Sequence, residues 1–248
     1  MAATSKINTD TTINKPILYY MIESPPCRTV IAVARLLKLD IELRSIDLSK
    51  NEQMNADFIR INPFHVVPTL QDDDGFILWE SRAIVTYLVQ KNRPYSNLYP
   101  SDDLKKRAII DRFLQYDLGT YFRAISDVAH GIFQIGRLNL EKLPRLKEIL
   151  ETFESFLADQ LGKNSDSSFL AGGNNLTLAD ISIYYSTTLL DVVPVINLAT
   201  AYPSLWSWFN RVEDQLAKEV NQNGEFDKAR ENMKSFAKFL QENAAYDA

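Results

Sequence analysis

The stretch Ile61–Arg82 limits the possible folds more than any other part of this chain. It holds a β-branched run interrupted by Pro68, an Asp-rich turn that ends at Gly75, a second apolar run and a polar segment that begins at Glu80. Proline cannot donate a hydrogen bond to a sheet ladder, so the strand edge beside Pro68 is left unfinished. The bond between Val67 and Pro68 is a candidate cis peptide, because only X-Pro bonds take that form at low cost. In either form, we expect the N–H and C=O groups of Val67 to point outward, where an extended peptide can pair with them as an added strand.

Glu80 and Ser81 fall where the next helix should begin. A helix start presents free N–H groups and the positive end of the helix dipole, so it favours carboxylates. A peptide-like ligand that carries a carboxylate fits both this helix start and the unfinished edge. The alternative is a hairpin packed on a helix with no ligand, which requires the proline, the acidic-serine pair and their spacing to coincide by chance.

Apolar spacing predicts the order strand, helix, strand, helix, strand, strand, helix for residues 16–93. The first strand is expected at Ile17–Tyr20, and the first helix is expected to begin at the prolines that follow Ser24, where missing N–H groups cost little. Ile41–Arg44 alternates like a second strand. This α+β order, βαβαββα, and the cis-proline candidate are what a thioredoxin-like domain requires, although the pattern by itself fits other α+β folds as well.

The second half of the chain carries helical patterns only. Residues 94–103 contain two prolines and no apolar periodicity, so we expect them to link two domains. Residues 104–248 are predicted to form an all-helical bundle, because apolar residues recur at helical spacing and Thr177 to Asp180 resembles a capping box. The predicted helices begin near Leu104, Leu143, Thr177, Tyr202 and Phe226.

Composition and charge argue against several classes of protein. The net charge of −5 disfavours nucleic acid as the main partner, because phosphate binding relies on concentrated Lys and Arg. Cys27 is the sole cysteine, and with only two histidines the chain offers a poor set of metal ligands and no internal disulfide. Residues 1–15 lack the apolar core of a signal peptide and are expected to form a flexible tail, and no apolar run approaches membrane-spanning length. We therefore expect a cytoplasmic protein with no metal, no membrane contact and no nucleic-acid partner.

Three motifs resemble those of one known family. Asn-Pro-x-His-x-Val-Pro-Thr-Leu at residues 62–70, Trp-Glu-Ser-Arg-Ala-Ile at 79–84 and Ser-x-Pro-Cys-Arg at 24–28 are similar to motifs of cytosolic glutathione S-transferases, in particular the insect delta and epsilon classes. The resemblance covers nearly the whole chain from Pro16 onward. It implies glutathione as co-substrate, hydrophobic electrophiles as second substrates and a homodimer. It also implies a thioredoxin-like glutathione-binding domain over residues 16–93 and a hydrophobic-substrate site in the helical domain.

Ser24 is the candidate catalytic residue. It follows the first predicted strand and precedes the first helix, so its hydroxyl is expected to face the Val67 edge. A thiolate placed there would accept a charge-assisted hydrogen bond of roughly 1.5 to 3 kcal/mol, which corresponds to about one to two units of thiol pKa. The resemblance implies that Ser24 stabilises the glutathione thiolate and does not itself attack. The alternative for a serine in this place is a plain helix cap.

The resemblance also implies which residues hold the two ends of glutathione. His65 is expected to bind the carboxylate of the terminal glycine. Glu80 and Ser81 are expected to hold the γ-glutamyl end of glutathione. The Glu80 carboxylate is expected to meet its ammonium group, and the helix start at Ser81 its carboxylate. Arg82 is expected to add a carboxylate contact or a bridge between subunits.

The middle of glutathione is expected to lie on the backbone of Val66 and Val67. Two nearby positions depart from the family pattern. Gln53 stands where many relatives have a histidine, and it can still donate to a carboxylate but without a positive charge. Phe64 replaces the commoner glutamine before His65. We expect these two departures to alter the affinity for glutathione.

The electrophile pocket is expected to be lined by Pro26 at the first helix and by Tyr116, Tyr121, Phe122 and Ile125 from the helical domain. The alternative for each aromatic side chain at helical spacing is a place in the core. The sequence is also compatible with two other functions on the same fold, a non-enzymatic carrier of hydrophobic ligands and a glutathione-dependent peroxidase or dehydrohalogenase.

Overall fold

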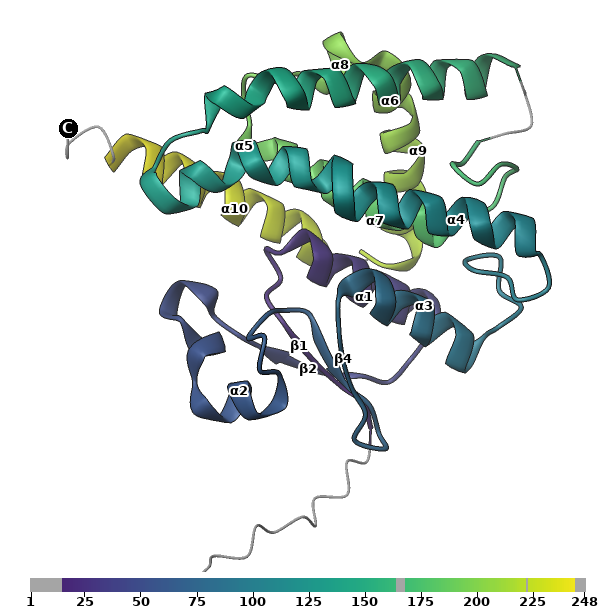
Figure 1. Cartoon of the computed structure of the whole chain (residues 1–248), viewed down its shortest axis with the longest axis vertical. Coiled ribbons are helices and arrows are strands. Elements are labelled where there is room, and N and C mark those ends of the chain that lie inside the picture. Colours follow the sequence, from purple (N-terminus) through teal and green to yellow (C-terminus); the bar gives the residue numbers. More distant parts are fainter. Residues whose placement is uncertain (1–14, 164–167, 222, 244–248) are drawn as a thin grey trace, which may run out of the picture.

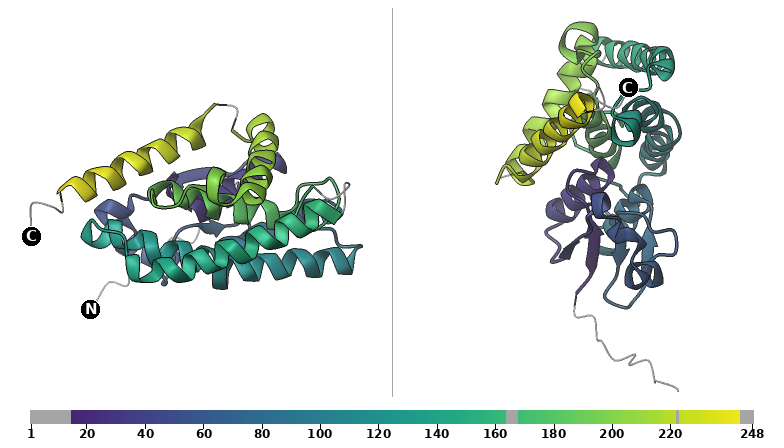
Figure 2. Two further views of the ribbon diagram at one scale, coloured as in Figure 1. Left: turned by 90° about the horizontal axis from the view of Figure 1, so that it is seen from above. Right: turned by 90° about the vertical axis from the view of Figure 1, so that its left-hand side faces the viewer.

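The computed structural model describes residues 15–163, 168–221 and 223–243. The chain forms a sheet part followed by a helical part, and Figure 2 shows them one above the other in its right-hand view. The flexible tail predicted for residues 1–15 lies outside the described residues except for Lys15. No helix in the described ranges is both long and apolar enough to cross a lipid bilayer.

The sheet part has a single mixed sheet of four strands in the order β2-β1-β3-β4. Strand β1 pairs in parallel with β2 and antiparallel with β3, and β3 pairs antiparallel with β4. The strands are β1 (Ile17–Tyr20), β2 (Glu42–Ser45), β3 (Thr69–Gln71) and β4 (Ile77–Trp79). The predicted βαβαββα order is confirmed, with the second strand one residue later than expected. The peptide bond between Val67 and Pro68, directly before β3, is cis.

Alternation along the strands decides which helix covers which face of the sheet. Leu18 and Leu70 are fully buried against the helices α1 and α3, which separate the sheet from the helical part (Figure 1). Ile17 and Tyr19 point to the opposite face and pack on Phe58 of α2. The three helices are α1 (Pro25–Leu36), α2 (Ala56–Ile61) and α3 (Ser81–Asn92).

Within residues 104–163, 168–221 and 223–243, all regular structure is helical, as predicted. The α-helices are α4 (Leu104–Tyr116), α5 (Phe122–Ile135), α6 (Leu143–Lys163), α7 (Leu178–Thr187), α8 (Leu198–Ala201), α9 (Pro203–Glu219) and α10 (Glu225–Asn243). The sequence patterns did not single out α5 or α8. A π-helical turn at Asp117–Tyr121 joins α4 to α5. No helix or strand forms in residues 93–103, where the linker was predicted.

Helix α7 is the centre of the helical part, and all ten of its residues are buried. Its start depends on the Asp180 carboxylate, which completes the predicted capping box. The carboxylate accepts hydrogen bonds from the backbone N–H (3.0 Å) and the hydroxyl (2.6 Å) of Thr177. It also accepts from the Leu170 N–H at 2.8 Å and from the Trp208 indole N–H at 3.1 Å. One buried side chain thus joins α7 to α9 and to the loop before α7.

Replacing Asp180 with Ala should lower the free energy of unfolding by roughly 3 to 5 kcal/mol. The substitution leaves several buried donors without an acceptor, and each one costs about 1 to 3 kcal/mol. Urea unfolding followed by circular dichroism measures the effect. Asp214→Ala, which removes an exposed carboxylate from α9, is the matched control and should change stability by less than about 0.5 kcal/mol. Equal losses in the two variants would contradict this role for Asp180.

Candidate active site

Strand register brings the predicted site residues to one end of the sheet. Tyr19 of β1 pairs with Thr69 of β3, and Thr69 pairs with Trp79 of β4. Because both pairings are antiparallel, the chain leaving β1, the chain entering β3 and the chain leaving β4 meet at the same end. Ser24, the Val67–Pro68 bond and Glu80 lie on these three segments, respectively. The predicted convergence of a hydroxyl, a free strand edge and a helix start follows from this topology.

Ser24 stands immediately before α1, and its hydroxyl does not cap the helix. The side chain is partly exposed and lies close to the thiol of Cys27. Burial raises the pKa of the Cys27 thiol to about 11, so this thiol stays protonated at neutral pH. Cys27 is therefore a core residue, and the Ser24 hydroxyl is available to a ligand.

Arg28 fixes the backbone that carries Ser24. It is fully buried in α1, and its Nη1 donates to the carbonyl oxygens of Ile22 at 3.2 Å and Glu23 at 3.0 Å. Its Nη2 donates to the Thr188 hydroxyl at 2.7 Å in the helical part. Burial lowers the pKa of Arg28 to about 10, so the guanidinium is still charged at neutral pH. The loop before Ser24 is thus held from both parts of the molecule by one cation.

The edge beside Pro68 is shaped by a buried asparagine. The Asn62 amide donates to the Thr69 hydroxyl at 2.9 Å and to the Val66 carbonyl at 3.3 Å. Thr69 also donates to the Val66 carbonyl, at 2.7 Å, so this carbonyl is already occupied. The backbone N–H and C=O of Val67 have no hydrogen-bond partner within the described parts of the chain. Val67 is therefore the residue with a backbone free to pair with a ligand.

His65 and Gln53 flank this edge. The imidazole of His65 is exposed, and the residue has a φ of 44°, in the left-handed region that non-glycine residues rarely adopt. Gln53 lies in a short 3₁₀ helix, Glu52–Met54. Its Oε1 atom is buried and accepts no hydrogen bond from any described residue. Both side chains keep polar atoms available to a ligand.

Glu80 and Ser81 form the start of α3. Glu80 is exposed with a φ of 70°, again in the left-handed region, and its side chain does not cap the helix. The carbonyl of Glu80 accepts the Ile84 N–H at 2.9 Å, so the helical hydrogen bonds begin there and the N–H groups before Ile84 are free of them. Such a helix start is a ready site for a carboxylate. Backbone strain of this kind is concentrated at functional sites.

Arg82 points inward, away from this helix start. Its Nη2 and Nε atoms lie 2.6 and 3.1 Å from Oδ2 of Asp117, and its Nη1 donates to the Ser81 hydroxyl at 2.9 Å. Asp117 is fully buried in the π-helical turn and also accepts a hydrogen bond from Ser182 at 2.5 Å. In this chain Arg82 thus forms an ion pair that joins the sheet part to the helical part. Its expected contact with a ligand carboxylate or with a second subunit stays a prediction.

Three of the predicted electrophile-pocket residues, Pro26, Tyr116 and Phe122, are partly exposed. Tyr121 and Ile125 are fully buried, contrary to the prediction that they line a pocket. The Tyr121 hydroxyl pairs with Thr187 of α7 at 2.9 Å, and both side chains belong to the main core. Tyr121 and Ile125 lie on the apolar side of α5 and of the π-helical turn before it, and this side packs on α7. The sequence pattern shows which side of a helix is apolar, but it does not show which helix covers that side.

A possible cation site lies at the opposite end of the sheet. The carboxylates of Asp72, Asp73 and Asp74 form the only cluster of three metal-type ligands within the described residues. Lys91 pairs with Asp72 at 2.8 Å and with Asp73 at 2.9 Å, and Tyr87 also binds Asp72. These carboxylates therefore stabilise the β3–β4 turn and lie apart from Ser24.

Comparison with known proteins agrees with this geometry. Family models described as the N-terminal and C-terminal domains of glutathione S-transferase match residues 15–90 and 137–211. The curated glutathione S-transferase D7 of Anopheles gambiae is 35% identical over 214 residues, covering 84% of this chain and 93% of the relative. This chain belongs to the glutathione S-transferase family.

Solved structures place this transferase among insect enzymes of two classes. A delta-class glutathione transferase of Nilaparvata lugens matches with a TM-score of 0.78 and 33% identity, covering 91% of this chain and 99% of that one. An epsilon-class enzyme of the housefly Musca domestica matches with a TM-score of 0.76 and 28% identity, covering 91% and 98%. The resemblance, the fold and the glutathione transferase activity predicted from the sequence are therefore confirmed. The carrier, peroxidase and dehydrohalogenase alternatives are not favoured.

Sequence analysis missed three residues that organise the site of this transferase. Asn62 was seen only as part of a motif, Arg28 only as a matching residue type, and Asp117 only as part of a folding motif. An Asn-Pro pair is a turn signal, which could have pointed to Asn62. The partners of Arg28 and Asp117 are distant in sequence, and no local signal identifies them.

Replacing Asp117 with Ala should lower the free energy of unfolding by roughly 3 to 5 kcal/mol, because it leaves the buried Arg82 charge without its partner. It should also raise the KM for glutathione, since Arg82 holds the Ser81 hydroxyl at the start of α3. Urea unfolding and steady-state kinetics measure the two effects. The control is Asp127→Ala, which breaks an exposed ion pair with Arg123 (2.8 Å) and should cost under about 1 kcal/mol. The ion pair would lose its assigned role if Asp117→Ala were no more damaging than this control.

Proposed function

We propose that this transferase binds glutathione in an extended form along the Val67 edge and ionises its thiol with the Ser24 hydroxyl. The proposal rests on one observation: Ser24, the free Val67 backbone and the start of α3 lie together at one end of the sheet. A hydroxyl that donates to a thiolate stabilises the anion and lowers the thiol pKa. The thiolate, held in this way, then attacks the electrophile.

The two ends of glutathione are assigned to the two sides of this edge. The γ-glutamyl carboxylate lies at the N–H groups and the hydroxyl of Ser81, and the ammonium group meets Glu80. The glycine carboxylate lies near His65 and Gln53. The exposure of Glu80 and His65 supports these assignments. Arg82 acts indirectly, through the Ser81 hydroxyl and Asp117.

The electrophile is assigned to the surface formed by Pro26, Tyr116 and Phe122, with Tyr121 and Ile125 supporting it from the core. Pro26 lies two residues after Ser24, so a hydrophobic molecule on this surface lies beside the thiolate. Holding both reactants in contact supplies much of the rate enhancement in reactions of this kind. We further assign glutathione binding to residues 16–93 and electrophile binding to residues 104–248, with residues 94–103 as the linker.

We also propose that the protein is cytoplasmic and forms a homodimer. The single buried, unpaired cysteine fits a reducing compartment. Its partners are then small hydrophobic electrophiles, glutathione and a second copy of the chain.

Replacing Ser24 with Ala should raise the pKa of bound glutathione by about one to two units, because the hydrogen bond to the thiolate is lost. The kcat/KM for a chlorodinitrobenzene-type electrophile should then fall by about 10- to 100-fold at neutral pH. Since the thiolate is present above its pKa, activity should recover as the pH rises. Ultraviolet absorbance of the thiolate and the pH profile of kcat/KM measure the shift.

Ser45→Ala, at the exposed end of β2, is the matched control and should leave the pH profile unchanged. Glutathione binding, followed by calorimetry, should persist in Ser24→Ala, because most of the ligand is held elsewhere. Ser24 would have no part in the mechanism if its variant kept the pH profile of the natural protein.

Sedimentation equilibrium at micromolar concentration should give twice the chain mass of 28.3 kDa. The mass should not change when glutathione is added, because none of the proposed ligand contacts requires a second chain. A single-chain mass under these conditions would rule out the homodimer.

A further inference from the structure

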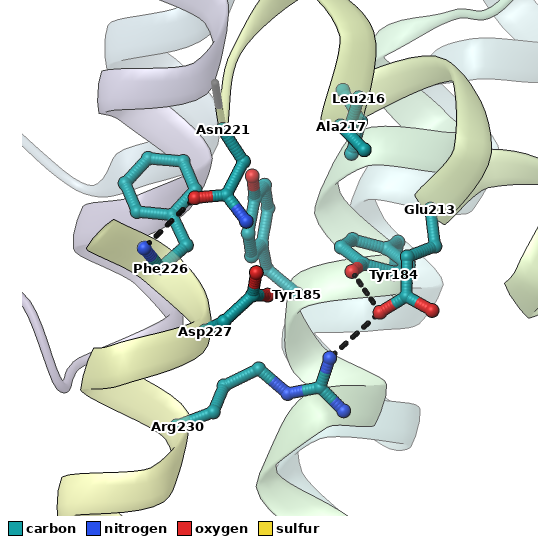
Figure 3. A pocket seen from close by; sticks show the side chains of 9 residues that line it. All are labelled: Tyr184, Tyr185, Glu213, Leu216, Ala217, Asn221, Phe226, Asp227 and Arg230. Carbon is teal, nitrogen blue, oxygen red and sulfur yellow. Dashed lines mark hydrogen bonds and ion pairs between the residues drawn. The ribbon is translucent and has the colours of Figure 1, made fainter. Parts of the chain in front are cut away.

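The helical part contains a cavity of about 280 Å³ that lies between α7, α9 and α10 (Figure 3). The aromatic rings of Tyr184, Tyr185 and Phe226 form part of its wall, together with the carboxylates of Glu213 and Asp227. None of the residues assigned to glutathione or to the electrophile lines this cavity. It is therefore a separate site from the one described above.

Two polar groups in the cavity wall have no partner within the described part of the chain. Tyr185 is only 2% exposed, and its hydroxyl, which points into the cavity, has no hydrogen bond to another described residue (Figure 3). Burial raises the pKa of this hydroxyl, so it stays neutral and can still accept a hydrogen bond. The nearby Asp227 carboxylate has no ion pair or hydrogen bond to any described residue. Asp227 is exposed, so water can solvate its carboxylate, but Tyr185 is nearly buried and aims its unpaired hydroxyl into the same cavity. Nearly buried polar side chains usually have a partner, so the two groups together mark a candidate ligand site.

The charges around the cavity favour a cation. Arg230 is the sole cation of the wall, and both sides of its guanidinium are already paired. Its Nε lies 2.8 Å from Asp191, and its Nη1 lies 2.7 Å from Glu213. Behind the wall, the buried Arg28 guanidinium lies 5.9 Å from the centre of the Tyr185 ring. Arg35 lies 4.9 Å from the centre of the Phe226 ring and is paired with Glu225 at 2.6 Å. Four carboxylates thus face three guanidinium groups, and Asp227, which has no partner among the described residues, is the one that opens into the cavity.

We propose that this cavity binds a small organic cation, an ammonium group attached to an aromatic or apolar body. The ammonium group donates to the Asp227 carboxylate and to the Tyr185 hydroxyl oxygen, with the ring faces adding cation–π attraction. The body lies among Tyr184, Phe226 and Leu216. The volume equals that of about nine water molecules at roughly 30 Å³ each. The ligand therefore has about ten non-hydrogen atoms, and an affinity on the order of 100 μM is expected for a ligand of this size.

Isothermal titration calorimetry with 2-phenylethylamine tests the proposal. The titration is done on the full chain saturated with S-hexylglutathione, so that the glutathione cleft and the adjoining electrophile surface are occupied. We expect binding of the protonated amine, and at least tenfold weaker binding of 3-phenylpropionate, an anion of similar shape, and of 2-phenylethanol, its neutral counterpart. Absence of amine binding, or equal binding of the three compounds, would overturn the proposal.

Two variants locate the ligand. Asp227→Asn keeps the shape of the side chain and removes its charge, and it should weaken amine binding by about tenfold while conjugation activity is unchanged. Tyr185→Phe removes only the hydroxyl and should weaken binding by a few-fold. Asp214→Asn, an exposed carboxylate of α9 outside the cavity, controls for the overall change in charge and should bind the amine as the natural protein does. If Asp227→Asn and Asp214→Asn bound the amine equally well, the cavity would not be the site.

Discussion

The buried ion pair between Arg82 and Asp117 is the contact on which the candidate site depends. Arg82 belongs to the first turn of α3, and Asp117 belongs to the π-helical turn between α4 and α5. Two buried charges stabilise a protein only when nearby groups compensate for their loss of water. Ser81, Ser182 and Ser186 supply further contacts here, while Oδ1 of Asp117 has no hydrogen-bond partner among the described residues. The pair fixes the start of α3 against the helical part, so the carboxylate site at this helix start has a defined position relative to the electrophile surface.

Arg28 is a second buried cation, and it fixes the Ser24 side of the site against the helical part. Arg28 holds the carbonyl groups that precede Ser24 and reaches across to Thr188. Ser24 and the start of α3, to which we assign the thiolate and the γ-glutamyl end, are each anchored to the helical part by a buried guanidinium, although both belong to the sheet part. A site built at the border of two packed units needs such anchors, because the reacting groups come from both of them.

The two ligand sites of this transferase differ in what they offer a ligand. The strand edge beside Pro68 presents backbone groups, a helix start and strained residues, which suit an extended peptide. The cavity between α7, α9 and α10 presents aromatic faces and an unpaired carboxylate, which suit a compact cation. The guanidinium of Arg28, which holds the loop before Ser24, lies 5.9 Å from the centre of the Tyr185 ring in the cavity wall. The two sites are therefore neighbours in the packed structure, although they share no lining residue.

The sequence by itself determined the features that depend on short-range physics. The order of strands and helices, the cis bond before Pro68, the helix start at Ser81 and the capping box at Asp180 all follow from the properties of a few consecutive residues. The strand edge beside Pro68 and the position of Ser24 before the first helix also required no knowledge of distant contacts. Hydrophobic patterning likewise indicated that the second half of the chain is helical.

Only the tertiary structure decided which side chains meet. Arg82 turns toward Asp117, 35 residues away along the chain, and forms an ion pair with it. Tyr121 and Ile125 face α7 and become core, while Tyr116 and Phe122 stay at the surface. The cavity at Tyr185 and Asp227 exists only because three helices leave a gap between them. A periodic pattern fixes the face of a helix but does not identify the neighbour of that face, because packing partners are chosen by contacts between segments far apart in the chain.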